Sequence, residues 1–170
     1  RVRQILEGLP VKWSYPEHPG RVAAIIELLE REPVAGVRLE TGREATREEL
    51  FAWLQGCEAV RMGVAVVSCQ DIDRHNILRA THLGMARALL ALPAPAADHA
   101  LVDGLAVKGL PCGHTPIVDG DALSASIAAA SIVAKVTRDR LMVELDRRYP
   151  GYGFARHKGY GTPGHVDALR

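Results

Sequence analysis

The sequence feature that most constrains the fold is a long helical segment over residues 124–148, which Pro150 ends. Proline cannot continue a helix, so the carboxyl end of this segment is well defined. An unbroken run of small residues at 128–131 would let the helix backbone approach a sheet closely. The high helix propensity of alanine explains the same run equally well. The segment therefore predicts a helix, with close packing on a sheet as one interpretation of its composition.

Strand patterns precede this helix. The valine-rich stretch VRMGVAVVS, residues 60–68, predicts a strand that could be buried on both faces. HALVDG, residues 99–104, predicts a second strand, and TPIVDGD, residues 115–121, a third. The order of these strands in a sheet is not readable from the pattern.

Helical patterns alternate with the strands. A short apolar helix is expected at 21–31, and another from Thr46 to about residue 54. Thr46 and Glu49 have the spacing of a capping box. We expect Asp71 to cap the following turn and a helix to run over residues 76–92, where apolar residues recur at helical spacing. This alternation predicts an α/β layer architecture.

Composition narrows the class of protein. A chain of 170 residues can bury one core, and its net charge of +1 gives no sign of a nucleic-acid partner, so any binding of a polyanion requires positive charge on one face. Cys57, Cys69 and Cys112 are scattered, which argues against a disulfide framework or a zinc site and favours reduced thiols in the cytoplasm. No apolar run reaches the length of a membrane span, so we expect no membrane partner.

Two acidic residues lie where an apolar stretch meets glycine. Asp103 follows Leu101 and Val102 and precedes Gly104. In open α/β sheets ligands bind beyond the carboxyl ends of strands, so an aspartate there can project into a crevice, although Asp-Gly is also an ordinary turn. Asp121 is a similar case. Asp119 is an alternative ligand, and both could instead cap the next helix.

The carboxyl-terminal stretch is rich in glycine, aromatic and basic residues. Aromatic rings can stack on sugars or bases while cations meet phosphates, as nucleic-acid binding requires. Glycine-aromatic loops are also common surface turns, so this signal is weak alone. The residues concerned are Tyr152, Phe154, Arg156, His157, Lys158 and Tyr160.

Taken together, these stretches resemble ribonuclease HII. The resemblance rests on GDALSASIAAASIVAKVTRDRLMVELDRRYPGYGFARHKGYGTPGH at 120–165, LVDG at 101–104 and DIDRHNILRATHLGMARAL at 71–89, in the family's order. It covers about residues 45–170, and the first 44 residues are divergent. The resemblance implies a ribonuclease H-like mixed sheet flanked by helices, here lacking some amino-terminal strands.

The family holds two divalent metals with four carboxylates. By resemblance Asp103 is the third and Asp121 the fourth, while Asp139 has a supporting role. We expect the two carboxylates to lie in one cluster. The family's first two carboxylates belong to an Asp-Glu-x-Gly-Arg-Gly motif, and the nearest match here is LETGRE, in which Glu40 fits and Leu39 replaces the aspartate. An alternative interpretation of LETGRE is a degraded form of a later family loop.

The same resemblance implies nucleic-acid contacts. Tyr160 matches the tyrosine that packs on the deoxyribose beyond the RNA–DNA junction, with Lys158 beside it, and Asn76 matches a residue that contacts the backbone. In the family the Gly-Arg-Gly loop contacts the 2′-hydroxyl of RNA. Gly42 and Arg43 match it here, and the last glycine is replaced by glutamate.

These implications give the expected function. We expect a monomeric endonuclease that uses Mg²⁺ or Mn²⁺ to cut RNA–DNA hybrids or ribonucleotides embedded in duplex DNA. One alternative is an impaired remnant that binds the duplex without cutting. Another is an unrelated α/β phosphate-binding domain, with Asp121 and Ser124 at a helix start. The chain begins with arginine, which favours a fragment or a processed form.

Overall fold

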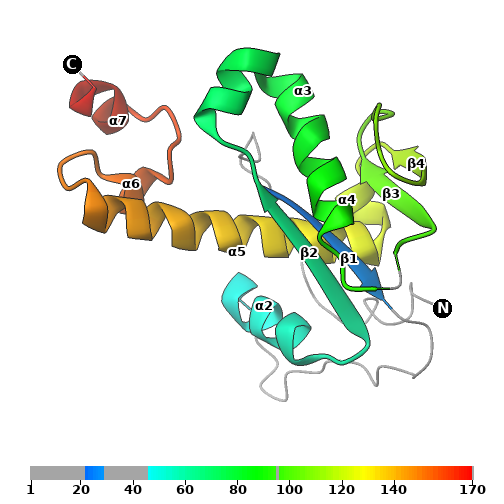
Figure 1. The fold of residues 1–170 in the computed structure, drawn as a ribbon. Helices are drawn as coiled ribbons and strands as arrows, with labels where there is room; N and C mark the ends of the chain where they lie inside the picture. The colour runs from blue at the N-terminus through cyan, green and yellow to red at the C-terminus, as the bar shows by residue number, and fades with distance from the viewer. Residues whose placement is uncertain (1–21, 29–45, 95, 170) are drawn as a thin grey trace.

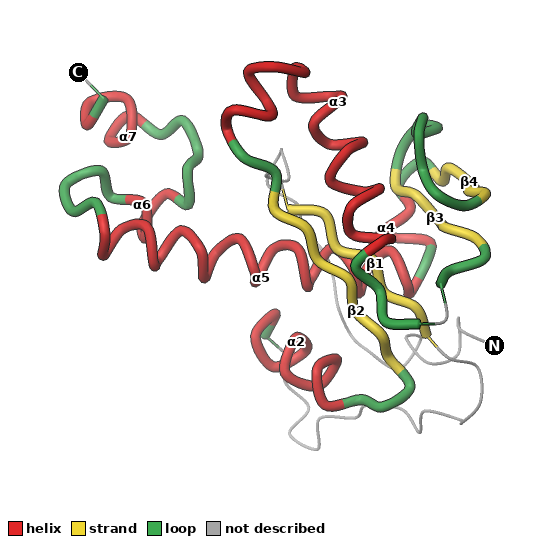
Figure 2. The backbone as a smooth tube through the Cα atoms, in the orientation of Figure 1, coloured by secondary structure: helices red, strands yellow, loops and turns green. Residues whose placement is uncertain are grey.

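The computed structural model describes residues 22–28, 46–94 and 96–169 (Figure 1). Its strands and helices, in chain order, are β1 (Val22–Leu28), α2 (Arg47–Gly56), β2 (Val60–Val66), α3 (Cys69–Leu90), β3 (His99–Asp103), β4 (Gly113–Ile117), α4 (Gly120–Leu123), α5 (Ala125–Arg148), α6 (Phe154–His157) and α7 (Pro163–Ala168). Figure 2 shows helices and strands interleaved along the chain, as the expected α/β class requires.

The first strand pair lies between layers of helix. β1 and β2 are antiparallel, with Val22 opposite Val66. Met62 and Val64 of β2 pack against a buried cluster formed by α2 and α5. Gly63 points the other way, towards the backbone of α3. Since successive strand residues face opposite sides, helices cover β2 on both faces. The burial is incomplete, because Val66 is exposed.

Two clusters form the core of the described residues. The first joins one face of α2 to the alanine-rich part of α5; it contains Leu50, Phe51, Leu54, Ala129, Ile132, Val133 and Val136. The second joins the end of α3 to β3 and the loop after it; it contains Leu89, Leu92, Ala100, Val102 and Val107. Of the small residues at 128–131, Ala128 and Ala129 are buried and Ala130 and Ser131 are half-buried, which supports close packing over simple helix propensity.

The long helix α5 connects the two ends of the molecule. Ser124 caps its amino end by accepting a hydrogen bond from the Ile127 amide at 3.4 Å, and it ends at Arg148 as Pro150 predicts. Its first turns lie beside α4 and β3, and its other end lies beside α6 (Figure 1). The carboxyl-terminal stretch forms two short helices, α6 and α7, within what the sequence indicated only as a glycine-rich tail.

One expected helix is wrong. The described part of 21–31, residues 22–28, is strand β1, because it pairs along its whole length with β2. A short apolar run is compatible with either structure, and a partner strand decides between them. The predicted elements at Thr46, at 60–68, at 99–104 and at 124–148 are confirmed. The third predicted strand is shifted: β4 ends at Ile117, before both Asp119 and Asp121.

The cap of α3 also differs from the prediction. Ser68, not Asp71, is the N-cap, and its hydroxyl accepts a hydrogen bond from the Asp71 amide at 3.1 Å. The helix then bends at Asn76, where the expected helix 76–92 begins. Ser68 was overlooked because serine and aspartate are equally good caps, so spacing alone did not separate them.

Candidate functional site

The carboxyl end of β3 is tied to the start of α4. β3 and β4 are parallel, with Asp103 opposite Ile117. The Asp103 carboxylate accepts a hydrogen bond through Oδ1 from the amide of Gly120 at 2.8 Å. Gly104 turns the chain away with φ 87°, a left-handed conformation that glycine adopts without strain. Asp103 therefore lies at the end of a parallel strand, facing the residue that precedes Asp121.

Close packing at Gly120 brings the backbone beside Asp121 near Asp103. Gly120 is buried, and a Cβ atom there would lie 2.6 Å from Cδ1 of Ile127 and 3.3 Å from Oδ1 of Asp103. Only a glycine lets the backbone beside Asp121 come this near to the Asp103 carboxylate. Asp121 follows directly, half-buried in the first turn of α4. Asp119 is exposed at the cap position, with φ 54° and no capping bond from its side chain.

The donor chemistry of this pair suits a hard divalent cation. An ionised carboxylate has about four lone-pair positions, so the bond from Gly120 leaves Asp103 with capacity for a metal. Carboxylate oxygens are the ligands that Mg²⁺ prefers. Within the described residues, no three His, Cys, Asp or Glu side chains converge on a metal position. Glu40, Gly42 and Arg43 lie outside the described residues, so Asp103 and Asp121 are the expected metal ligands that the structure describes.

Tyr160 is held against α5. Its ring is half-buried, with the guanidinium carbon of Arg138 at 4.9 Å and Nζ of Lys135 at 5.5 Å from the ring centre. Arg138 also donates a hydrogen bond to the carbonyl of Lys158 at 2.7 Å. Lys135 in turn pairs with Asp139 at 2.6 Å, so Asp139 acts on this cluster through Lys135. These contacts place Tyr160 at the surface above two cations.

A buried histidine stabilises the turn that carries Tyr160. Nδ1 of His157 accepts a hydrogen bond from the Gly159 amide at 3.1 Å. Its Nε2 lies 2.7 Å from the Tyr152 carbonyl and must therefore carry the proton, because a carbonyl only accepts. The His165 ring stacks on His157 with centroids 4.1 Å apart. The neutral imidazole thus joins both sides of the turn.

Asn76 occupies a sharp bend in α3. Its backbone has φ 65° and ψ 167°, a region that glycine favours, and such strain costs on the order of 1–3 kcal/mol. Its Oδ1 accepts a hydrogen bond from the Arg79 amide at 3.1 Å, which caps the second part of the helix. Asn76 and the two residues after it, Ile77 and Leu78, are exposed.

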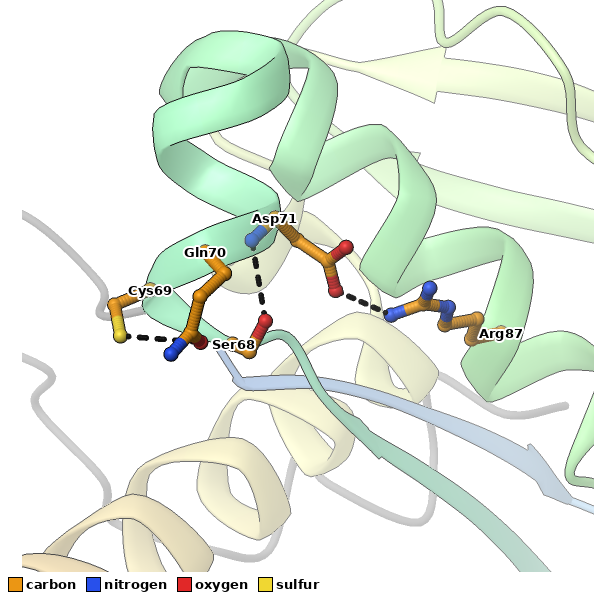
Figure 3. A network of polar contacts seen from close by, with 5 residues as sticks. All are labelled: Ser68, Cys69, Gln70, Asp71 and Arg87. Carbon is orange, nitrogen blue, oxygen red and sulfur yellow. Dashed lines mark hydrogen bonds and ion pairs between the residues drawn. The ribbon is translucent and has the colours of Figure 1, made fainter.

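An ion pair spans this bend. Arg87, on the second part of α3, donates to Oδ2 of Asp71, on the first part, at 3.0 Å (Figure 3). The hydrogen bond from Arg87 is the main cause that lowers the pKa of Asp71 below its ordinary value, and bonds from Ser68 add to it. Asp71 is therefore a charged partner in a network that joins both parts of the helix.

Sequence reasoning missed the role of the α5 cations. Lys135 and Arg138 lie under Tyr160, whereas Arg140 is exposed and pairs with Glu48 at 2.5 Å. The three-residue spacing of Lys135 and Arg138 places them on one helix face, which is the signal that could have indicated a shared partner.

The chain is similar to known proteins over most of its length. The family model described as Ribonuclease HII matches residues 41–170. Ribonuclease HII of Geobacillus kaustophilus is 56% identical over 124 residues, which cover 73% of this chain and 46% of that protein. Ribonuclease HII of Cereibacter sphaeroides is 48% identical over 152 residues, covering 89% of this chain and 66% of that protein. This chain spans about half the length of several such relatives.

A solved structure shows the same fold. The crystal structure of ribonuclease H2 from Pyrococcus horikoshii superposes with a TM-score of 0.60 at 22% identity, over 87% of this chain and 85% of that one. The expected ribonuclease H-like α/β class is thereby confirmed. No helix in the described residues has the length and apolar character needed to span a membrane. The matched residues 41–170 make this chain a member of the ribonuclease HII family, not an unrelated phosphate-binding domain.

Proposed function

We propose that this chain carries part of the active site of an endonuclease that hydrolyses RNA in RNA–DNA hybrids or at ribonucleotides embedded in duplex DNA. It acts as a monomer, and its unpaired cysteines suit a reducing cytoplasm. The observation that carries the proposal is the hydrogen bond to the Asp103 carboxylate from the amide of Gly120, the residue before Asp121. Asp103 ends a parallel strand, and a second carboxylate converging on it from Asp121 would suit metal-assisted phosphodiester hydrolysis.

Asp103 and Asp121 would hold Mg²⁺ or Mn²⁺, with Glu40 as a proposed third ligand. When bound, a pair of such ions supplies a deprotonated water and neutralises charge on the reacting phosphate. The protein's own contribution is to keep two negative charges close together. The hydrogen bond from Gly120 orients the Asp103 carboxylate, whose remaining lone pairs could bind a cation.

Substrate contacts are proposed at Tyr160, Asn76 and Lys158, with Gly42 and Arg43 reading the 2′-hydroxyl. Tyr160 has a half-buried ring above Arg138, so an approaching sugar would meet an aromatic face that is already positioned. Asn76 is exposed at the bend of α3. In Figure 1 this bend and the α6–α7 region stand on the same side of α5, as two contacts with one duplex require.

One observation favours a second function, in which the protein binds the duplex without cleaving it. The family uses four carboxylates, the described residues contain no group of three or more candidate ligands, and Leu39 stands where the resemblance expects aspartate. Removal of a metal ligand weakens metal binding more directly than it weakens contacts with the duplex. The two functions therefore separate in an experiment that measures binding and cleavage independently.

The test uses duplex DNA with one embedded ribonucleotide. Binding is titrated in Ca²⁺, cleavage is followed in Mg²⁺ and in Mn²⁺, and all-DNA duplex is the reference substrate. We expect Asp103→Asn and Asp121→Asn each to abolish cleavage and to weaken Mn²⁺ binding in calorimetry, with little change in duplex affinity at low metal. Glu144→Gln is the matched control, because Glu144 is an exposed carboxylate on α5.

The outcomes distinguish the functions. Cleavage by the wild type that both aspartate variants lose supports the nuclease. Tight binding without cleavage by the wild type supports the binding function. Mn²⁺ affinity unchanged in both variants, or equal affinity for the all-DNA duplex, contradicts the proposal.

A further inference from the structure

We propose that the Asp71–Arg87 ion pair is a positioning element that holds the bend of α3 and so presents Asn76 to the duplex. The inference rests on the proposed contact at Asn76. Asp71 and Arg87 are 16 residues apart in one helix, yet their side chains meet at 3.0 Å because the helix bends between them (Figure 3).

The two parts of α3 differ in how firmly they are anchored. The part after the bend contains all the buried residues of the helix, Ala80, Gly84, Ala88 and Leu89. The part before it, residues 69–75, has no buried side chain. Core packing therefore fixes the second part, and the ion pair with Arg87 links the first part to it. Ser68 fixes the start of the first part by capping at Asp71.

The bend itself needs such a link. A non-glycine residue at φ 65° and ψ 167° persists only when surrounding contacts hold it. Asn76 contributes one of these contacts through its bond to the Arg79 amide. That bond lies on the second part of the helix and does not restrain residues 69–75. The Asp71–Arg87 pair is a side-chain contact that does cross the bend, and its loss would let Asn76 change direction while the rest of the fold stays intact.

The sign of the expected effect distinguishes positioning from charge. Asp71→Asn removes a negative charge, which by itself strengthens binding to a polyanion. If the ion pair positions Asn76, the same variant weakens binding. We expect the dissociation constant for duplex DNA with one ribonucleotide to rise about two- to fivefold in Ca²⁺ at fixed salt, the factor that corresponds to an exposed ion pair.

Two variants control this measurement. Glu48→Gln also removes one negative charge and one surface ion pair, that with Arg140. This ion pair joins α2 to α5 and does not cross the bend of α3. Glu48→Gln should leave binding unchanged or slightly tighter. The exchange Asp71→Arg with Arg87→Asp keeps the net charge and restores an ion pair across the bend. It should bring the dissociation constant back towards the wild-type value.

Hydrogen exchange of the free protein gives a readout that needs no nucleic acid. In Asp71→Asn we expect the amides of residues 74–79 to exchange faster, by a similar about two- to fivefold, while those of 84–90 stay protected. Unchanged exchange at 74–79, or duplex binding by Asp71→Asn as tight as by the wild type, overturns this inference alone. Failure of the wild type to bind the duplex overturns the proposed function and this inference together.

Discussion

Gly63→Ala tests the close packing of β2 against the end of α3, the part of this helix that the core holds. A Cβ atom on Gly63 would lie 2.1 Å from the carbonyl oxygen of Ala88 and 3.0 Å from the amide nitrogen of Leu92. Both are backbone atoms of the helix and its end, so no side-chain rotation relieves the contact. Carbon and oxygen need a further separation of roughly 1 Å, which requires the strand or the helix to move.

The expected cost is therefore at the upper end of overpacking effects. Inserting one methyl group into a packed core typically costs about 1–3 kcal/mol, and a clash with backbone belongs near about 3 kcal/mol or above. Urea unfolding followed by circular dichroism measures this cost, with the slope of the transition compared to check that unfolding stays two-state.

Gly56→Ala is the matched control for this substitution. Gly56 is the last residue of α2, and a Cβ atom there meets nothing within 4 Å. Alanine is the better helix former, so the free energy of unfolding should stay constant or rise by up to about 1 kcal/mol. A loss of less than about 1 kcal/mol in Gly63→Ala would refute the close approach of β2 to α3.

Three further predictions follow from single contacts. Thr46→Ala removes the capping box of α2, in which the Thr46 hydroxyl accepts a hydrogen bond from the Glu49 amide at 3.2 Å. It should lower the free energy of unfolding, measured in urea, by about 1 kcal/mol, and an unchanged urea midpoint would contradict this. Tyr160→Ala should weaken duplex binding by about 1–3 kcal/mol in a titration at fixed salt, with little change in melting temperature; a collapsed melting temperature would make Tyr160 a packing residue. Because the pKa of Asp71 is lowered in the folded protein, its ion pair stabilises the fold at pH values above the ordinary pKa of about 3.9 and loses this effect as pH falls through the lowered pKa. The difference in free energy of unfolding between wild type and Asp71→Asn should therefore shrink on acidification. A difference that stays constant with pH would argue against the ion pair.

Local chemistry explains the elements that the sequence predicted correctly. The ends of α5 depend on Ser124 and Pro150, which act on their own neighbours in the chain. The start of α2 depends on Thr46 and Glu49, only three residues apart. The end of β3 follows from apolar residues giving way to Asp103 and Gly104. Such signals are read over a few residues, so these element ends and the place of Asp103 at the end of a strand were predictable.

Some elements of the fold depended on contacts between distant segments. Residues 22–28 have an apolar pattern that suits a helix, and pairing with β2 makes them a strand. The bend at Asn76 is unfavourable locally, and the contacts around it join distant residues: α3 packs on the core after the bend, and Arg87 pairs with Asp71 across it.

The candidate site shows the same division. The residue types at Asp103, Asp121 and Tyr160 were readable from the sequence, because each stands in a distinctive local motif. Their surroundings were not, since Gly120 meets Asp103 across 17 residues and Arg138 meets the Lys158 carbonyl across 20. The sequence by itself determined which chemical groups this chain carries and most of the helices and strands that bear them. Only the tertiary structure decided which groups share a surface, because a hydrogen bond between distant residues forms only once packing has brought their backbones together.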